Sequence, residues 1–527
     1  MTDSDASRNE AVDAKGRSSR IAGAVGLGYL SQFLTVGIGL WLTPFLLHRL
    51  GLRDYGLWLL ALQLTSYLVL LDLGVVALLP RETAYAVGRA GGNQRSPELP
   101  LLIGRTLRIV ILQLPLVAAI AVGLLLLLPS EWQPLRGPLC LIVGTFVAMF
   151  PIRLLHAILQ GLQELPYLAK VSLATWSLGT LTTVSLVFLH VGLYAVAIGW
   201  VVSQVTSALL WWVRISFYHR EVLPSTIPPV TRDTLRGWVR SGLWVSVAQV
   251  AQVLLAGTDL LIIGKVLGPI AVVPYAVTGK LISVLANQPQ MVMQAAQPAL
   301  SEIKATEDER HRLVRMTIAL SQLMLLISGA VFLVVVVANK GFVSWWVDPK
   351  QYAGFSVTMA LLVNMMLRHW NTTTVYAIFA FGNERRIAIT TLVDGLVTVV
   401  AAGTLVHFIG PVGAACGSIL GVSIVSLPNN LRALVSDTNS SMSAVLRPLS
   451  PWFFRFLLLV VATLGIANSW TPAAPIGLAA ITFLIIGGYA LTMWPVALRQ
   501  PLGEYIRPRI HALSQRVLNV RTNGAGI

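Results

Sequence analysis

Long apolar stretches separated by short polar turns dominate the pattern of this chain. A membrane-spanning helix needs about 20 mostly apolar residues. Fourteen stretches fit: 21–48, 55–79, 107–128, 137–160, 167–189, 193–217, 241–264, 269–297, 313–338, 354–379, 386–408, 413–434, 453–470 and 474–495. Two neighbouring pairs are joined by the very short turns "HVG" and "IGPVG", and merging either pair would lower the count. The pattern predicts an all-α, polytopic membrane protein with about 14 transmembrane helices.

The composition supports the same class. The chain is 55% hydrophobic and only 11% charged, with a mean hydropathy of +0.74, whereas about 25% of the residues of a soluble domain are charged. Cys140 and Cys416 both lie in apolar segments, so neither a disulfide framework nor a metal cluster is indicated. The first 20 residues are polar and lack the apolar core of a signal peptide.

The basic residues are distributed unevenly along the chain. If the N-terminus is cytoplasmic, 29 of the 38 Lys and Arg residues fall in cytoplasmic segments, 6 in outer turns and 3 inside spans. This bias predicts that both termini are cytoplasmic. It also accounts for the net charge of +16 through contact with an anionic lipid bilayer, without nucleic acid as a partner.

A weak repeat divides the chain. Tyr55 precedes Glu82 by 27 residues, and Tyr275 precedes Glu302 by the same distance. Each tyrosine opens a span and each glutamate follows its inner end, which indicates parallel six-helix repeats around a central cavity. The predicted organisation is a disordered cytoplasmic tail at 1–20, lobes at 21–217 and 241–434, a cytoplasmic linker at 218–240, two additional helices in 453–495 and a basic cytoplasmic tail at 496–527.

The stretch 269–297 carries polar residues at helical spacing. The stripe consists of Lys280, Ser283, Asn287, Gln290, Gln294 and Gln297. Lipid cannot cover such a face, so it is expected to line a cavity or a helix interface. Lys280 is about 16 Å into the span, near the middle of the membrane.

Two other spans place cations inside the membrane. Asn364, Arg368 and Asn371 share one face, although Arg368 can also pair with Asp394 on the next span. Arg153 follows Pro151 and could instead extend to the inner headgroups. Inward-facing cations suit an anionic group such as phosphate. The predicted substrate-binding residues are Lys280, Arg368, Arg153, Asn287, Gln290, Gln294, Asn364 and Asn371.

Charged residues inside or beside the spans, most of them acidic, form a second group of candidates. A carboxylate in hydrocarbon needs compensation, so these residues are structural partners, gating contacts or ion-coupling groups. Asp72, Asp259, Asp394, Arg81 and Glu302 are assigned to ion coupling or gating. No paired-carboxylate motif, nucleophile elbow, metal-ligand spacing or phosphate-binding loop is present, which predicts a non-enzymatic protein without metal or cofactor.

Several short motifs resemble a known family. "LGLRDYGLW", "LLDLG" and "RETA" look like the opening helices of the Wzx-type oligosaccharide (O-antigen/polysaccharide) flippases, which belong to the superfamily of the MATE exporters and the lipid II flippase. "GTDLLIIGKVLG" and "FGNERR" resemble later segments, so the resemblance covers about 20–435. Unlike some relatives, the first two spans carry no Lys or Arg in their middle.

The resemblance implies a lipid-linked substrate and a transport cycle. The substrate would be a polyprenyl-diphosphate-linked oligosaccharide, moved by alternating access from the cytoplasmic to the outer leaflet of a bacterial inner membrane. The product would serve cell-surface polysaccharide synthesis, such as lipopolysaccharide or exopolysaccharide, beside other assembly proteins. An ion-coupled multidrug or small-cation exporter of the same fold, a membrane-embedded glycan polymerase or ligase, and a non-transporting scaffold remain alternatives. No outer loop exceeds roughly 16 residues, which disfavours the polymerase.

Overall fold

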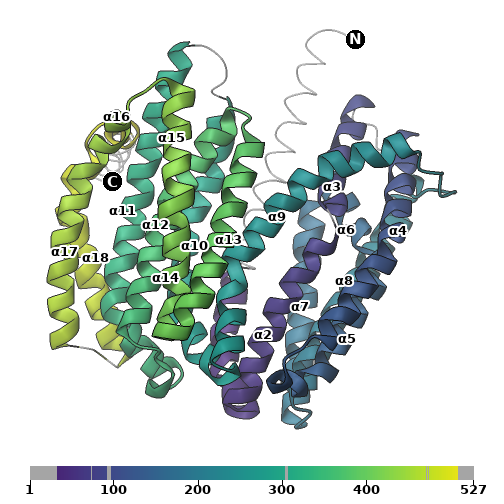
Figure 1. Ribbon diagram of the computed structural model, residues 1–527, viewed down its shortest axis with the longest axis horizontal. Helices are drawn as coiled ribbons and strands as arrows, with labels where there is room; N and C mark the ends of the chain where they lie inside the picture. Colours follow the sequence, from purple (N-terminus) through teal and green to yellow (C-terminus); the bar gives the residue numbers. More distant parts are fainter. Residues whose placement is uncertain are drawn as a thin grey trace, which may run out of the picture. The chain divides into compact units, whose positions relative to one another are not determined.

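The computed structural model describes residues 32–72, 74–91, 97–302, 307–470, 472 and 474–508, and every regular element in these ranges is a helix (Figure 1). The chain divides into two compact units, one up to Val250 and one from Ala251. The division lies inside a single helix, α9 (Arg232–Val266). Because α9 begins at Arg232, part of the predicted linker 218–240 is helical.

The first unit is built from helices that pack through small residues. A helix at Gln32–Leu50 opens it. The elements that follow are α2 (Leu52–Leu68), η1 (Val69–Asp72), α3 (Val75–Arg89), α4 (Glu98–Leu126), η2 (Ser130–Leu135), α5 (Arg136–Met149), α6 (Arg153–Gly161), α7 (Leu165–Phe188), α8 (Leu193–Tyr218) and η3 (Arg220–Val222). Helices α7 and α8 approach so closely at Gly179 and Gly199 that a Cβ at either position would overlap the opposite helix, as is common between membrane helices.

The second unit is arranged around one central helix. Its elements after α9 are α10 (Pro269–Glu302), α11 (Glu307–Trp346), η4 (Pro349–Gln351), α12 (Phe355–Ala380), α13 (Glu384–Ile409), α14 (Val412–Gly421), η5 (Val422–Ser426), α15 (Leu427–Thr438), α16 (Met442–Leu446), η6 (Arg447–Leu449), α17 (Ser450–Ser469) and α18 (Pro475–Ala497). The run Leu333–Ala338 of α11 is buried on every face. A helix that is apolar all round belongs in a core, and α11 contacts α10, α12, α17 and α18.

Most of the predicted spans coincide with helices. Within the described residues, eleven helices are long and apolar enough to cross a membrane, or up to 13 if each of two bent pairs is one span. Helix α12 coincides with the predicted span 354–379 but is not among them, and it carries the polar residues Asn364, Arg368 and Asn371. The all-α polytopic class is confirmed, whereas the count of fourteen stays a prediction.

Two of the spans predicted in the first unit are not single straight helices. The range 55–79 is interrupted at Gly74, whose φ of 74° strains any residue with a side chain. The range 137–160 bends by 54° between α5 and α6, at Pro151, whose ring nitrogen cannot donate a helical hydrogen bond.

In the second unit, one predicted span contains a wider turn. The range 413–434 includes the π-helix η5 between α14 and α15. Such turns are frequent at functional sites. By contrast, α10 remains one helix through Pro289.

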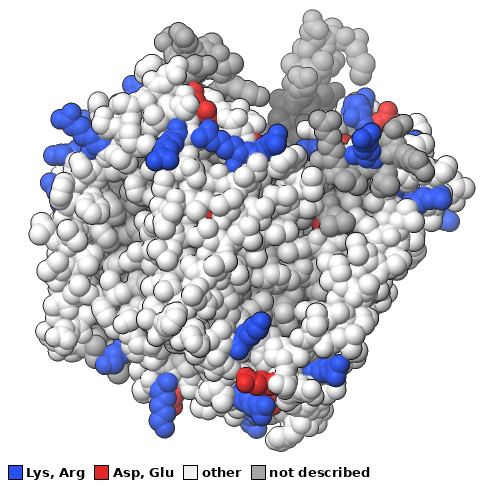
Figure 2. All heavy atoms as spheres, viewed as in Figure 1, with Lys and Arg blue, Asp and Glu red and all other residues white. Residues whose placement is uncertain are grey.

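Charged side chains gather near the helix ends. On the face shown in Figure 2, most of the visible charged side chains lie near the ends of helices, and few charged atoms appear between them. This distribution fits helices that cross a hydrocarbon layer.

Candidate functional site

The polar stripe of α10 lies away from the core of the second unit. Ile282 packs into the apolar core, whereas Ser283 and Gln290 are exposed and Lys280 and Asn287 are half-buried. The periodic pattern therefore predicted which side of α10 is apolar and which is polar. The side chains of Gln294 and Glu302 lie outside the described residues.

Lys280 is a cation in the middle of an apolar span. It lies eleven residues after Pro269 in a candidate span that ends at Met293, or about 16 Å along the helix. Within the described part of the chain, its ammonium group forms no ion pair or hydrogen bond with another side chain. An intramembrane cation without such a partner is costly to the fold.

Arg368 has an internal partner. Its guanidinium forms a bidentate pair with Asp394, with one Nη2–Oδ1 distance of 3.1 Å, and also donates to Ser418 Oγ at 3.0 Å. Asp394 is fully buried and accepts further hydrogen bonds from Thr398 and from Ser426 on the π-helix. The alternative expectation, that Arg368 pairs with Asp394, is thus what the structure shows.

A second carboxylate, Asp259, belongs to the same unit. It accepts a hydrogen bond of 2.9 Å from Tyr275 Oη and is close enough to Arg368 to interact with it electrostatically. Because Arg368 is already paired with Asp394, its guanidinium is less available to a bound anion than an unpaired cation would be.

The predicted asparagines differ in their surroundings. Asn371 accepts a hydrogen bond of 2.8 Å from Asn430, which joins α12 to α15. A bond of this kind stitches membrane helices together. The Oδ1 atom of Asn364 is buried and has no hydrogen-bond partner among the described residues, so Asn364 has an unused acceptor.

Asp72 terminates the broken second span of the first unit. Its Oδ1 accepts a hydrogen bond of 2.9 Å from the backbone N–H of Gly74, which is the short local turn that aspartate favours. The basic residue that interacts with Asp72 is Arg153. Arg81, the inner-end residue assigned to gating, is exposed and pairs with its neighbour Glu82 at 3.2 Å.

Arg153 is the first residue of α6, at the 54° bend. Its guanidinium lies over the rings of Phe146 and Phe150, at 5.2 and 6.0 Å from their centroids. Its Nη1 atom is buried without a hydrogen-bond partner in the described residues. The guanidinium is therefore held inside the first unit by aromatic contacts.

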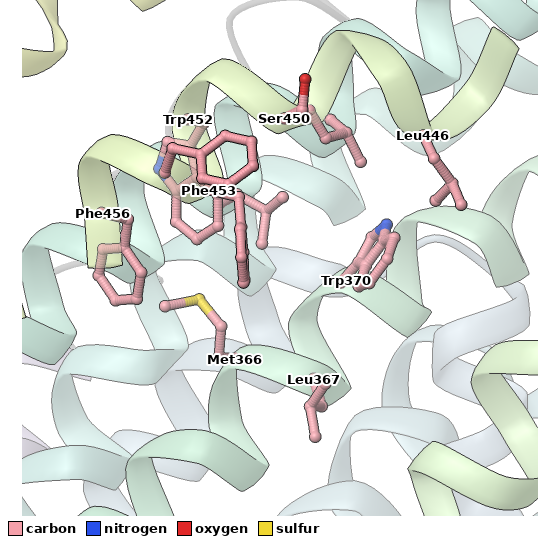
Figure 3. A pocket seen from close by; sticks show the side chains of 11 residues that line it. Met366, Leu367, Trp370, Leu446, Ser450, Trp452, Phe453 and Phe456 are labelled. Carbon is pink, nitrogen blue, oxygen red and sulfur yellow. The ribbon is translucent and has the colours of Figure 1, made fainter. Parts of the chain in front are cut away.

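An apolar pocket in the second unit was not predicted. It has a volume of about 380 Å³, and Figure 3 shows Met366 and Trp370 of α12 opposite Trp452 and Phe456 of α17. Such a lining suits a hydrocarbon chain. The aromatic run "PWFFRF" at 451–456 is the sequence signal that could have indicated it.

No group of three or more His, Cys, Asp and Glu side chains that could hold a metal ion occurs within the described ranges.

Part of the chain matches a known family model. Residues 152–345 match the family described as "Polysaccharide biosynthesis protein". This segment includes α10 with Lys280 and the broken helix with Arg153. No curated protein matches the chain.

Comparison with solved structures identifies the fold. The lipid II flippase MurJ in an inward closed conformation aligns over 89% of this chain and 99% of its own, with a TM-score of 0.64 and 12% identity. An inward-facing multidrug resistance MATE family transporter of the MOP superfamily aligns over 79% of this chain and 96% of its own, with a TM-score of 0.54 and 14% identity. A eukaryotic MATE transporter, AtDTX14, covers 83% and 98%, with a TM-score of 0.54 and 15% identity. The chain accordingly has the MATE and MurJ fold, and its segment 152–345 is similar to the polysaccharide biosynthesis protein family.

Proposed function

We propose that this protein, a polysaccharide biosynthesis transporter of the MOP superfamily, moves a polyprenyl-diphosphate-linked oligosaccharide from the cytoplasmic to the outer leaflet of a bacterial plasma membrane. Transport proceeds by alternating access, without covalent chemistry on the substrate. The delivered glycan serves cell-surface polysaccharide synthesis beside other assembly proteins. Both termini of the chain are cytoplasmic in this proposal.

The observation that carries the proposal is Lys280. A half-buried ammonium in the middle of a span, on a polar face and without an internal partner, attracts an anion. The diphosphate of a lipid-linked glycan is such an anion, and it must pass the middle of the membrane. Exposed amide groups such as Gln290 on the same face can hydrogen-bond to sugar hydroxyls.

The other predicted residues take roles that follow from their surroundings. Arg368, Asn364 and Asn371 contribute polar groups from α12, and Arg153 contributes a cation in the first unit. The remaining polar groups of α10 extend the face that the substrate contacts: Asn287, Gln290 and Gln294. Residues for gating or ion coupling are Asp72, Asp259, Asp394, Arg81 and Glu302.

Family and fold are consistent with this substrate. The matched family is described by polysaccharide biosynthesis, and one protein with the same fold is a flippase of a lipid-linked molecule. Multidrug transporters share the fold too. The cation at Lys280 favours an anionic substrate over a cationic drug, because like charges repel in a medium of low dielectric constant.

Flipping in proteoliposomes tests the proposal. The purified protein is reconstituted with a fluorescent undecaprenyl-diphosphate-linked sugar, and the outer-leaflet fraction is followed with and without a proton or sodium gradient. Lys280→Met should reduce the flipping rate about 10-fold or more, since a charge-assisted hydrogen bond contributes ~1.5–3 kcal/mol.

Lys265→Met is the matched control, because it removes the same charge from an exposed position at the end of α9. It should leave flipping unchanged. If the wild-type protein moves an amphiphilic cation but none of a diverse set of lipid-linked glycans, the multidrug alternative replaces this proposal.

A further inference from the structure

A second cavity, which has a polar lining, is formed by residues of the first unit alone. It has a volume of about 200 Å³ and lies where α5 and α6 meet α8. Its polar lining consists of Arg153 and His156 from α6, with Gln204 and Trp211 from α8. Since a water molecule occupies about 30 Å³, the cavity has room for one or two phosphate groups but not for an oligosaccharide.

The cavity residues hold hydrogen-bond donors that the protein leaves unused. Arg153 Nη1 and Trp211 Nε1 are both buried, and neither has a hydrogen-bond partner among the described residues. A buried donor without a partner costs about 1–3 kcal/mol, and more when it is charged. Two such donors beside one cavity indicate that an acceptor binds there.

The surroundings fix the position of these donors. Phe146 and Phe150 lie against the Arg153 guanidinium, and the His156 ring packs against the Trp211 ring with centroids 5.0 Å apart. These aromatic contacts keep the side chains in place before any ligand arrives. Such preorganisation lowers the entropy cost of binding.

The electrostatics favour an anion. Arg153 opens α6, so the positive end of that helix adds to the guanidinium charge. Among the described residues, no acidic side chain forms an ion pair with Arg153, although Asp72 is close enough to interact with it electrostatically. Arg153 Nη1 therefore remains available as a donor.

We propose that this cavity binds a phosphate group, held by Arg153 and Trp211 and flanked by His156 and Gln204. The phosphate can belong to a lipid or be free in solution. The inference deepens the role that the proposed function gives to Arg153, and it holds whether or not Lys280 takes part in glycan flipping.

Ligand-induced stabilisation of the purified full-length protein in detergent tests the inference. The unfolding temperature is measured against rising concentrations of two probes, inorganic pyrophosphate and undecaprenyl phosphate, because a ligand of the native state stabilises it in proportion to RT ln(1 + [L]/Kd). A saturable response to undecaprenyl phosphate alone assigns the site to a lipid phosphate. A response to both probes, or to pyrophosphate alone, assigns it to the phosphate group itself.

Variants connect the response to the cavity. Arg153→Gln should raise the Kd of the phosphate probe about 10-fold. Trp211→Phe, which keeps an aromatic ring but removes the N–H donor, should raise it roughly 3-fold. Arg136→Gln, an exposed position at the start of α5, is the matched control and should bind like the wild type. If Arg153→Gln does not fold, Arg153→Lys, which keeps the charge but loses the planar fork, takes its place with a smaller rise.

Four results separate the outcomes. The absence of a saturable response to either probe overturns the inference, and so does wild-type binding in both the Arg153 and the Trp211 variants. Lys280→Met should keep the response, so a loss of flipping with retained phosphate binding leaves this inference intact. Flipping that survives in the absence of phosphate binding rejects this inference and leaves the proposed function intact.

Discussion

Each unit contains a buried aspartate near an arginine, and the two pairs are built differently. In the second unit, Arg368 and Asp394 form a bidentate ion pair that further hydroxyl groups complete. In the first unit, no ion pair joins Asp72 and Arg153 among the described contacts, and Asp72 accepts a hydrogen bond from the backbone N–H of Gly74 instead. In the second unit the arginine is therefore occupied by the ion pair, whereas in the first unit the arginine remains available to bind another group.

Both pairs lie where the helical backbone is irregular. The π-helix η5 presents Ser426 to Asp394, and the breaks at Gly74 and Pro151 flank Asp72 and Arg153. Irregular backbone inside a membrane is tolerated where protein buries it or where it lines a polar cavity. The second unit shows the first case, and the cavity at Arg153 shows the second.

The largest predicted effect is on the stability of the second unit. Arg368→Gln leaves Asp394 buried without its counter-charge, which typically costs about 3–5 kcal/mol when a buried pair is broken. Thermal unfolding in detergent should show a marked fall in stability. Arg432→Gln, an exposed arginine on α15, removes the same charge and should be nearly neutral; equal stability of the two variants would show that the ion pair contributes nothing.

A smaller effect is expected in the first unit. Asp72→Asn keeps an oxygen that can accept the Gly74 hydrogen bond but removes the charge near Arg153, so the loss should be about 1 kcal/mol. The measurement is the same unfolding assay with Asp394→Asn alongside. A loss as large as that of Asp394→Asn would erase the distinction between the two pairs.

The smallest effect concerns a neutral bond between helices of the first unit. Ser207 Oγ donates to Thr175 Oγ1 at 2.9 Å between α8 and α7. Ser207→Ala should cost about 0.6 kcal/mol, the average for such bonds inside membranes. Thermal unfolding of this variant beside Asp72→Asn tests whether a partly compensated charge matters more than a neutral bond; the reverse order would contradict that view.

The sequence predicted correctly which residues share a face where the face belongs to one helix, whereas their role in binding stays a prediction. Lys280 and Gln290 share a face because residues three or four apart lie on the same side of an α-helix, and α10 is continuous over that stretch. The pairing of Arg368 with Asp394 could be offered only as an alternative. It depends on how α12 and α13 rotate against each other, which their separate sequences do not specify.

The prediction was less complete where several helices meet. Asp72 was assigned to ion coupling or gating from its place in a span, and nothing in its own segment indicated that it lies near enough to interact electrostatically with Arg153, 81 positions later in the sequence. Trp211 and Gln204 gave no sign of a site, since an isolated tryptophan or glutamine in a span is ordinary. Only the bend at Pro151 and the packing of α8 bring them to one cavity.

The sequence by itself determined the membrane class, the helices and the polar face of α10. These properties follow from local apolar length and helical period, which need no distant contact. Only the tertiary structure decided which charges are neutralised and which remain available. That outcome depends on helix packing and on the breaks at Gly74 and Pro151, because an arginine in a membrane interior binds whichever acceptor the packing places within reach.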